Sequence, residues 1–411
     1  MTNLAIANIR HRKLRSSLAA IGVMIGIASL ITMLSLSHGT LDEVARRIEG
    51  IDADLIVLPS KSSLIFSEGA PLSDKYIEKI KSVKINNHEL VADVYPVYLA
   101  IMPSMAGQQQ RVFGIRKSDF KIFTRSRKII AGSIFDDAFA RYINKLRNSV
   151  NGNYQPEKIS RKLLQSACQL VIDERLAKAG HYSVGDKISF LGQQFIICGI
   201  VESGGAARVF APIEVIRFIQ NGGINWSSLF FIKLKKQLRN ACEHSASEEN
   251  VIEQAASAIR KKVHLRIVPL SSYNNMLFES FKPIYIYINM ASGLVLLVSF
   301  LFVMVTIYTI VLERRKEIGI LRSMGADSLY ILKQTIGEAM IISLFGTVSG
   351  IIVSYIARWA IETYRPLLTV DIQNRWLILA ITVGTLGALI SALYPGIKAI
   401  REDPVAALNY E

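Results

Sequence analysis

The chain has 411 residues, a formal charge of +15 and a hydrophobic fraction of 51%, with a mean hydropathy of +0.31. It is longer than one typical domain, and its apolar residues cluster in long runs, which favours membrane segments over an unusually large soluble core. Much of the positive charge lies beside these runs, where Lys and Arg determine membrane topology, so the charge argues poorly for nucleic-acid binding.

The first predicted membrane helix covers residues 17–37, a run without charge. Residues 1–16 mix apolar and basic side chains at a spacing that suits a cytoplasmic helix in the membrane interface. A signal peptide is the alternative, but the apolar run is longer than a usual signal core and no clear cleavage site follows it. We therefore predict an uncleaved anchor. Gly22 and Gly26 stand four residues apart, as in a face for close helix packing, although glycine is also simply common in membrane helices.

Residues 38–283 are predicted to form a large α+β domain outside the cytoplasm. A βαβ-type lobe is expected from two separate segments, 50–116 and 226–270, because each carries strand-like and helix-like patterns in alternation. A β-rich lobe, residues 117–225, is expected as an insertion between them, since short apolar runs there are punctuated by glycine. Pro96 interrupts one predicted strand and argues for a sheet edge or a bulge.

The chain has three cysteines, Cys168, Cys198 and Cys242. Their spacing matches no zinc or redox motif, and three thiols leave one unpaired. A disulfide between Cys168 and Cys198 would suit an oxidising compartment, but buried unpaired thiols are the favoured interpretation.

Three further membrane helices are predicted, at residues 284–312, 336–357 and 376–397. Basic residues beside them place two segments in the cytoplasm, 313–335 and the C-terminal 398–411, and leave a short outer loop at 358–375. The predicted fold is thus an α-helical membrane protein with four transmembrane helices plus a large α+β extracytoplasmic domain.

Motifs for catalysis or phosphate binding are missing from the sequence. It contains no GxxxxGK[ST], HExxH, CxxC or GxSxG, and its six histidines form no ligand-like pair. We therefore predict no catalytic residue and no metal site. Glu338 is a carboxylate in the third membrane helix, where a functional role is the default hypothesis and a hydrogen bond to the nearby cytoplasmic segment is the alternative.

The cytoplasmic segment between the second and third helices begins with ERRKEIGILRSMGA, residues 313–326. In a helix, the four-residue spacing of Glu313 and Glu317 sorts charged and apolar side chains onto different faces. Four apolar side chains would then serve as anchors for the groove of a partner protein: Ile318, Ile320, Leu321 and Met324. Gly325 suits a helix end. A solvated turn is the alternative, but exposed apolar side chains favour a partner.

These residues carry a resemblance to a known family. The chain resembles the MacB/FtsX-like permeases of ABC transporters, which include macrolide-exporter, lipoprotein-releasing and cell-division permeases. The segments that carry the resemblance are 313–326, the neighbouring residues 337–339, 395–411 (PGIKAIREDPVAALNYE), 8–28, 51–59 and 184–203. The polar, helix-like segment at 141–165 looks like an insertion.

The resemblance implies a permease in the bacterial inner membrane with both termini in the cytoplasm. It implies a homo- or heterodimer that works with ABC ATPase subunits, in contact with membrane lipid and with a periplasmic adaptor as a further candidate partner. ATP and Mg²⁺ would be bound by the ATPase, which is expected in a separate chain. Residues 313–326 would be the coupling helix, with these contact residues: Glu313, Arg314, Arg315, Lys316, Glu317, Ile318, Gly319, Leu321, Arg322, Met324, Gly325 and Ala326.

Two functions within this family stay open on the sequence. The first is export or extraction of amphiphilic or envelope cargo, driven by movement of the extracytoplasmic domain. The second is a mechanical regulator of envelope hydrolases that transports nothing. A membrane-anchored ligand sensor or enzyme is the alternative from a different class.

Overall fold

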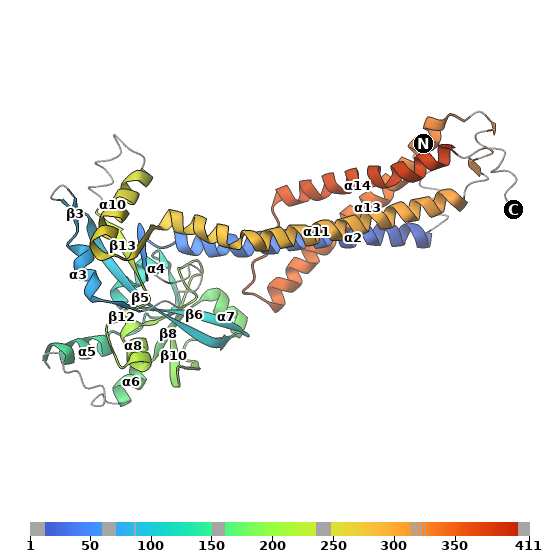
Figure 1. Ribbon diagram of the computed structural model, residues 1–411. Helices are drawn as coiled ribbons and strands as arrows, with labels where there is room; N and C mark the ends of the chain where they lie inside the picture. Colours follow the sequence, from blue (N-terminus) through green and yellow to red (C-terminus); the bar gives the residue numbers. More distant parts are fainter. Residues whose placement is uncertain are drawn as a thin grey trace. The chain divides into compact units, whose positions relative to one another are not determined.

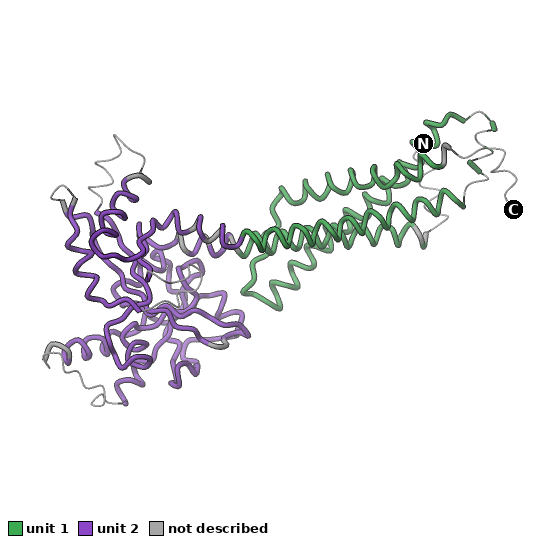
Figure 2. The backbone as a smooth tube through the Cα atoms, in the orientation of Figure 1, with its two compact units in different colours: residues 1–40, 282–411 green, residues 41–281 purple. Residues whose placement is uncertain are grey.

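The computed structural model describes residues 13–59, 71–85, 88–149, 161–235, 248–313, 317–318, 320, 323–324 and 326–401. The chain forms two compact units (Figure 2). Unit 1 comprises residues 1–40 and 282–411, and unit 2 comprises residues 41–281.

Among the described residues, four long helices form unit 1, each with a stretch apolar enough to cross a membrane, and two of them extend into unit 2 (Figure 1). They are α2 (Lys13–Glu49), α11 (Leu270–Glu313), α13 (Ser328–Tyr364) and α14 (Asn374–Arg401). Each helix extends beyond the apolar run from which a span was predicted, because the polar flanks stay helical. The segment predicted at 313–335 therefore includes the start of α13, and the segment predicted as the outer loop 358–375 is helical at both ends.

Glycine and serine residues let the four helices approach closely. A Cβ atom on Gly346 of α13 would lie 2.6 Å from Cβ of Val23 and 2.8 Å from the Ala20 carbonyl oxygen of α2. Gly350, one turn later, meets α2 in the same way. The Ser343 hydroxyl donates a hydrogen bond across to the Gly384 carbonyl of α14 at 2.8 Å. Close backbone approach between small residues is how membrane helices associate, because lipid supplies no hydrophobic driving force between them.

The first half of unit 2 is a four-stranded sheet with two helices on one face. Its strands are β1 (Leu55–Leu58), β5 (Val91–Met105), β13 (Leu229–Leu234) and β14 (Arg266–Pro269), in the order β14-β1-β13-β5. Helices α3 (Lys75–Lys81) and α10 (Glu248–Val263) pack against it through a shared apolar core. Neighbouring strands are antiparallel, so each helix joins two parallel strands with a third between them. These are the two βαβ-type halves predicted from the sequence, in split form.

Strand β5 continues into the second half of unit 2. Residues up to Val97 pair with β13, whereas pairing with β6 (Gln108–Ile115) starts at Tyr98. Pro96 therefore has a neighbouring strand on one side only and lies at a local edge of the sheet, which is one of the two placements that the sequence suggested. Pro96 pairs with Phe230 on β13 and precedes Tyr98, the first residue that pairs with β6. No hydrogen bond from Pro96 to β6 is therefore required, which suits a residue without a backbone N–H.

Beyond β6 the same sheet continues with strands from the segment expected as an insertion. They are β11 (Val209–Pro212), β8 (Gln169–Asp173), β10 (Gln193–Val201) and β7 (Ile129–Gly132), with β9 (Lys187–Phe190) paired to β10. Strand β6 lies parallel to β11, although the sequence placed β6 in the first lobe. One sheet path thus joins the two expected lobes, because β5 is long enough to serve both halves.

Short helices and two-stranded pairs complete unit 2. The helices are η1 (Lys117–Asp119), α4 (Phe120–Thr124), α5 (Ala138–Ser149), α6 (Arg161–Ala167), α7 (Glu174–Gly180) and α8 (Ile213–Asn221). The pairs are β2 (Leu72–Ser73) with β12 (Trp226–Ser227) and β3 (Lys84–Ile85) with β4 (His88–Glu89). Edge-to-face aromatic pairs hold the second half together, including Phe120 with Phe210 and Phe123 with Phe231.

The two described cysteines are free thiols. Cys168 is buried, and the half-buried Cys198 donates a weak hydrogen bond to the Leu170 carbonyl at 3.2 Å. Burial raises the pKa of both thiols to about 11. The disulfide that the sequence allowed between them is absent. The interpretation favoured from the sequence, that of unpaired thiols, holds for both. Cys242 lies outside the described residues.

Candidate functional site

The cytoplasmic segment predicted at 313–326 is described in part. Glu313, Glu317, Ile318, Ile320, Ser323, Met324 and Ala326 are described, whereas Arg314, Arg315, Lys316, Gly319, Leu321, Arg322 and Gly325 lie outside the described residues. Residues 317, 318, 320 and 323 are helical, and the Met324 amide donates to the Ile320 carbonyl at 3.0 Å.

The apolar side chains of this segment divide between two environments. Ile318 is half-buried and packs against the core of the helical unit. Ile320 is 49% exposed and Met324 is 79% exposed, and Glu317 is exposed as well. One side of the segment is therefore anchored on unit 1, while another side presents apolar surface with a carboxylate beside it. Its role in coupling stays a prediction.

The other two unit 1 features predicted from the sequence lie at helix contacts. Glu338 is only 4% exposed within α13. Burying a carboxylate between membrane helices is expensive, and its role, functional or a hydrogen bond to the nearby cytoplasmic segment, stays a prediction. Gly22 and Gly26 lie on the side of α2 that faces α11, where added Cβ atoms would meet Phe302 and Ser299.

The end of α2 carries an ion cluster inside unit 2 that the sequence did not reveal. Glu43 accepts hydrogen bonds from Arg47 at 2.7 Å and from Arg208 at 3.0 Å, and it pairs with Arg175 at 3.2 Å. Arg47 also reaches the carboxylate of Asp173 at 3.3 Å. These arginines come from α2, from α7 and from the loop before β11, so the cluster ties the end of α2 to the sheet.

Asp173 has two structural roles in this cluster. Its side chain caps α7 by accepting the Leu176 amide at 2.7 Å, and it is 1% exposed. Burial raises the pKa of Asp173 above its ordinary value, even though the Arg47 charge acts in the opposite direction. The only sequence signal was the Asp-Glu-Arg run that opens α7, which is a common helix start. The pairing with residues 43 and 47 is a long-range contact that no local pattern shows.

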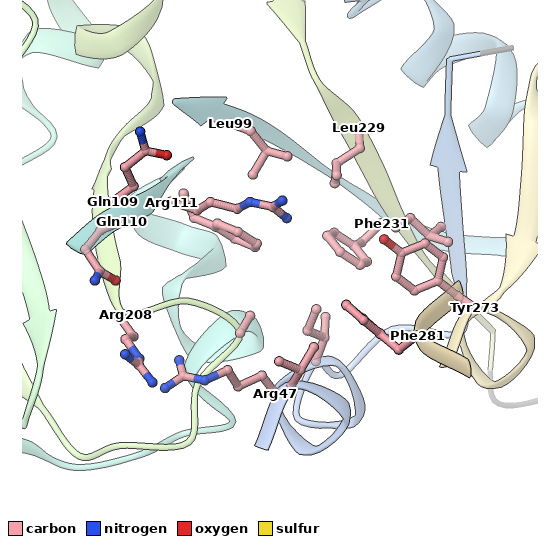
Figure 3. Close-up of a pocket in the computed structure, with 15 residues that line it drawn as sticks. Arg47, Leu99, Gln109, Gln110, Arg111, Arg208, Leu229, Phe231, Tyr273 and Phe281 are labelled. Atoms are coloured by element: carbon pink, nitrogen blue, oxygen red, sulfur yellow. The ribbon is translucent and has the colours of Figure 1, made fainter. Parts of the chain in front are cut away.

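Next to this cluster unit 2 contains a cavity of about 400 Å³. The ends of α2 and α11 line it together with β1, β5, β6, β13 and the 206–208 segment. Figure 3 shows two kinds of wall: Arg47 and Arg208 lie together near Gln109 and Gln110, whereas aromatic side chains of Phe231, Tyr273 and Phe281 gather on the other side. Cavities of roughly 300–1,000 Å³ with mostly apolar walls and a few polar groups are typical of ligand sites.

The titratable groups of the described residues show no arrangement for catalysis. No group of three or more His, Cys, Asp or Glu that could hold a metal ion occurs in the part of the chain that the structure describes. Burial raises the pKa of Tyr273 above its ordinary value, so this phenol stays neutral, although Arg111 and Arg266 lower it in part.

Two family models match the chain. One described as a MacB-like periplasmic core domain matches residues 16–261, and one described as an FtsX-like permease C-terminal matches residues 289–404. Together they cover both units.

Relatives with similar sequences are named as ABC permeases. The macrolide export ATP-binding/permease protein MacB of Mannheimia succiniciproducens is 22% identical over 99% of this chain, which spans 60% of that relative's length. An uncharacterized ABC transporter permease of Methanocaldococcus jannaschii is 22% identical over 99% of this chain and 97% of its own length. Among solved structures, the periplasmic region of MacB from Actinobacillus actinomycetemcomitans is 13% identical, with a TM-score of 0.35, and the match covers 56% of this chain and 95% of that one.

Proposed function

We propose, from the premise that this chain belongs to the family of FtsX-like permeases with a MacB-like periplasmic core domain, that it couples ATP hydrolysis by a separate ATPase to movement of unit 2. Membership implies an ATPase partner and a second permease copy. The relative from Methanocaldococcus jannaschii, which matches over nearly its whole length, is named an ABC transporter permease. ATP and Mg²⁺ would be bound by that ATPase.

The observation that carries the coupling proposal is the exposed apolar surface of Ile320 and Met324. Both side chains lie outside the predicted membrane spans, and docking helices insert exposed apolar side chains of this kind into a partner's groove. The segment lies between two candidate membrane helices, and its neighbour Ile318 is fixed on the bundle. A push on the segment would therefore act on the helices themselves.

Continuous helices support the transmission of that push. Both α2 and α11 contain residues of unit 1 and of unit 2, and α11 has Pro283, which donates no helix hydrogen bond, next to that boundary. In unit 2, the Glu43 cluster binds the end of α2 to α7 and to the loop before β11. A movement of α2 would thus be delivered to the sheet.

The cargo that we propose is amphiphilic or envelope-derived, and its movement is export or extraction. The relative from Mannheimia succiniciproducens is named a macrolide exporter, which favours transport over regulation of hydrolases. We place the chain in a bacterial inner membrane with both termini in the cytoplasm and unit 2 outside, because basic residues flank the helices on one side. A periplasmic adaptor and membrane lipid would complete the set of partners.

The test is co-expression with the ATPase that co-purifies with the permease, followed by ATPase assays in nanodiscs. Ile320→Asp should reduce the permease-dependent ATPase rate by about tenfold or more, because one buried apolar anchor contributes about 1.5–3 kcal/mol and 1.4 kcal/mol corresponds to tenfold. Tyr364→Asp is the matched control, since Tyr364 is an 81% exposed side chain at the far end of α13. Normal coupling in Ile320→Asp and Met324→Asp would overturn the proposal.

A further inference from the structure

The cavity in unit 2 has a polar end with excess positive charge. Among the described residues that line it, three are arginines, Arg47, Arg111 and Arg208, and none is acidic. The cluster that adjoins it adds Arg175 and two carboxylates, Glu43 and Asp173. The described lining itself thus contributes three guanidinium groups and no carboxylate.

The Glu43 carboxylate orients the arginines at this end. It contacts Arg47, Arg175 and Arg208 at 2.7–3.2 Å and so holds their guanidinium groups in place. An anion that entered the cavity would meet guanidinium groups that are already oriented, which reduces the entropy cost of binding.

The opposite end of the cavity is apolar and aromatic. In Figure 3 the rings of Phe231, Tyr273 and Phe281 lie across the cavity from Arg208, and the Arg111 side chain extends between the two ends. Leu99 and Leu229 close this end from the strands. Burial of an apolar group of a ligand against these side chains would remove it from water, which favours binding.

The size and polarity of the cavity restrict the chemical class of ligand that it could bind. A purely apolar solute would bring no charge to offset the excess at the arginine end, and a small inorganic anion would leave the aromatic end unfilled. A cation would meet the excess positive charge. A molecule with an acid group at one end and an apolar chain or ring at the other satisfies both ends, because buried charge is stabilised by an opposite charge and apolar surface by apolar contact.

We propose that this cavity binds an anionic amphiphile, with a carboxylate or phosphate between Arg111 and the Arg47–Arg208 pair and an acyl or aryl group against Phe231, Tyr273 and Phe281. This rests on the proposed function, since it names the class of cargo that the permease would handle. The site lies between the ends of α2 and α11, so an occupant contacts the two helices that connect unit 2 with unit 1.

The experiment uses the full chain in phosphatidylcholine nanodiscs at pH 8 with a photoactivatable long-chain fatty acid. The matched neutral probe is the alcohol of the same chain with the same diazirine. Peptide mapping by mass spectrometry should locate saturable labelling by the acid on peptides that contain Phe231, Tyr273 or Phe281. The alcohol should label them at least about tenfold less efficiently, as expected for the loss of one charge-assisted contact.

Variants separate the cavity from the rest of the surface. Arg111→Gln and Arg208→Gln should each raise the half-saturating concentration of the acid by about tenfold. Gln109→Trp changes an exposed side chain at the cavity wall and should block labelling without disturbing the core. Arg116→Gln, an exposed arginine just beyond β6 that does not line the cavity, should label as the parent does.

Three results would overturn the inference. They are equal labelling by acid and alcohol, labelling confined to peptides outside the cavity, and displacement of the acid by inorganic phosphate at the same concentrations as by unlabelled fatty acid. The last result would identify a site for a soluble anion instead. If labelling fails while Ile320→Asp still uncouples the ATPase, the inference falls and the proposed function stands. If labelling is intact while Ile320→Asp and Met324→Asp couple normally, the ligand site stands and the proposed function falls.

Discussion

Replacing Glu43 by glutamine should destabilise unit 2 by about 3 kcal/mol. The Glu43 side chain is 13% exposed and joins three guanidinium groups, at 2.7, 3.0 and 3.2 Å. Hydrogen bonds to charged groups contribute about 1.5–3 kcal/mol each, and removal of one partner from a buried ion pair costs about 3–5 kcal/mol. We take the lower end of the second range because Arg175 is 45% exposed and would be solvated again after the change.

Thermal unfolding of the full chain measures this loss. A change of 1 kcal/mol shifts Tm by about 2–4 °C for a domain of 150–250 residues, so the transition of unit 2 should fall by about 6–12 °C. Hydrogen exchange at residues 42–49 should rise as well, because the cluster ties this end of α2 to the sheet.

The matched control for this prediction is Glu253→Gln. Glu253 is 53% exposed and pairs with Arg260 at 3.4 Å, so its loss should cost less than about 1 kcal/mol. If Glu43→Gln and Glu253→Gln unfold at the same temperature, the reasoning about the cluster is refuted.

Three further predictions concern burial, packing and thiol reactivity. Burial raises the pKa of Asp119, so the folded state holds its proton longer than the unfolded state, and the parent loses stability as pH rises from about 4 through the folded pKa. Asp119→Asn should therefore gain Tm relative to the parent between pH 4 and pH 8, and a constant difference would contradict this. Gly346→Ala should lower the Tm of the helical unit, with a cost of about 1–3 kcal/mol, because its Cβ meets the α2 backbone, whereas Gly337→Ala has open space and should be neutral. Cys168 should resist alkylation by iodoacetamide at pH 8 until the protein is unfolded, and rapid modification in the native state would exclude a buried neutral thiol.

The family and the fold class follow from the sequence because their signals are local. Apolar runs such as residues 284–312 need no knowledge of their neighbours to indicate membrane helices, and the strand-like run at 55–58 is buried on both faces, as its uniform apolar character indicates. The resemblance to MacB/FtsX-like permeases rested on short motifs spread along the chain, and the family is confirmed.

The division of unit 2 into lobes was not predictable in the same way. Whether β6 pairs with β5 alone or also with β11 depends on register between residues about a hundred positions apart, such as Val112 and Val209. The same limit applies to the candidate site. Glu43, Arg175 and Arg208 meet only after the sheet has formed, and each is an ordinary surface residue by its local pattern. The glycine pair Gly346 and Gly350 was within reach of sequence analysis, since its spacing repeats that of Gly22 and Gly26.

The continuity of α2 and α11 sets a thermodynamic condition on the proposed transport cycle. Both helices line the cavity in unit 2, and both belong to the helical bundle. If a ligand in the cavity favours one arrangement of these helices, then the ATP-driven event that changes this arrangement must alter the ligand's affinity by the same factor, and the ligand must in turn alter nucleotide affinity. A tenfold drop in cargo affinity would need about 1.4 kcal/mol of coupling free energy. Cargo release would then be measurable from the nucleotide side alone, as a shift in ATP affinity when the amphiphile is added.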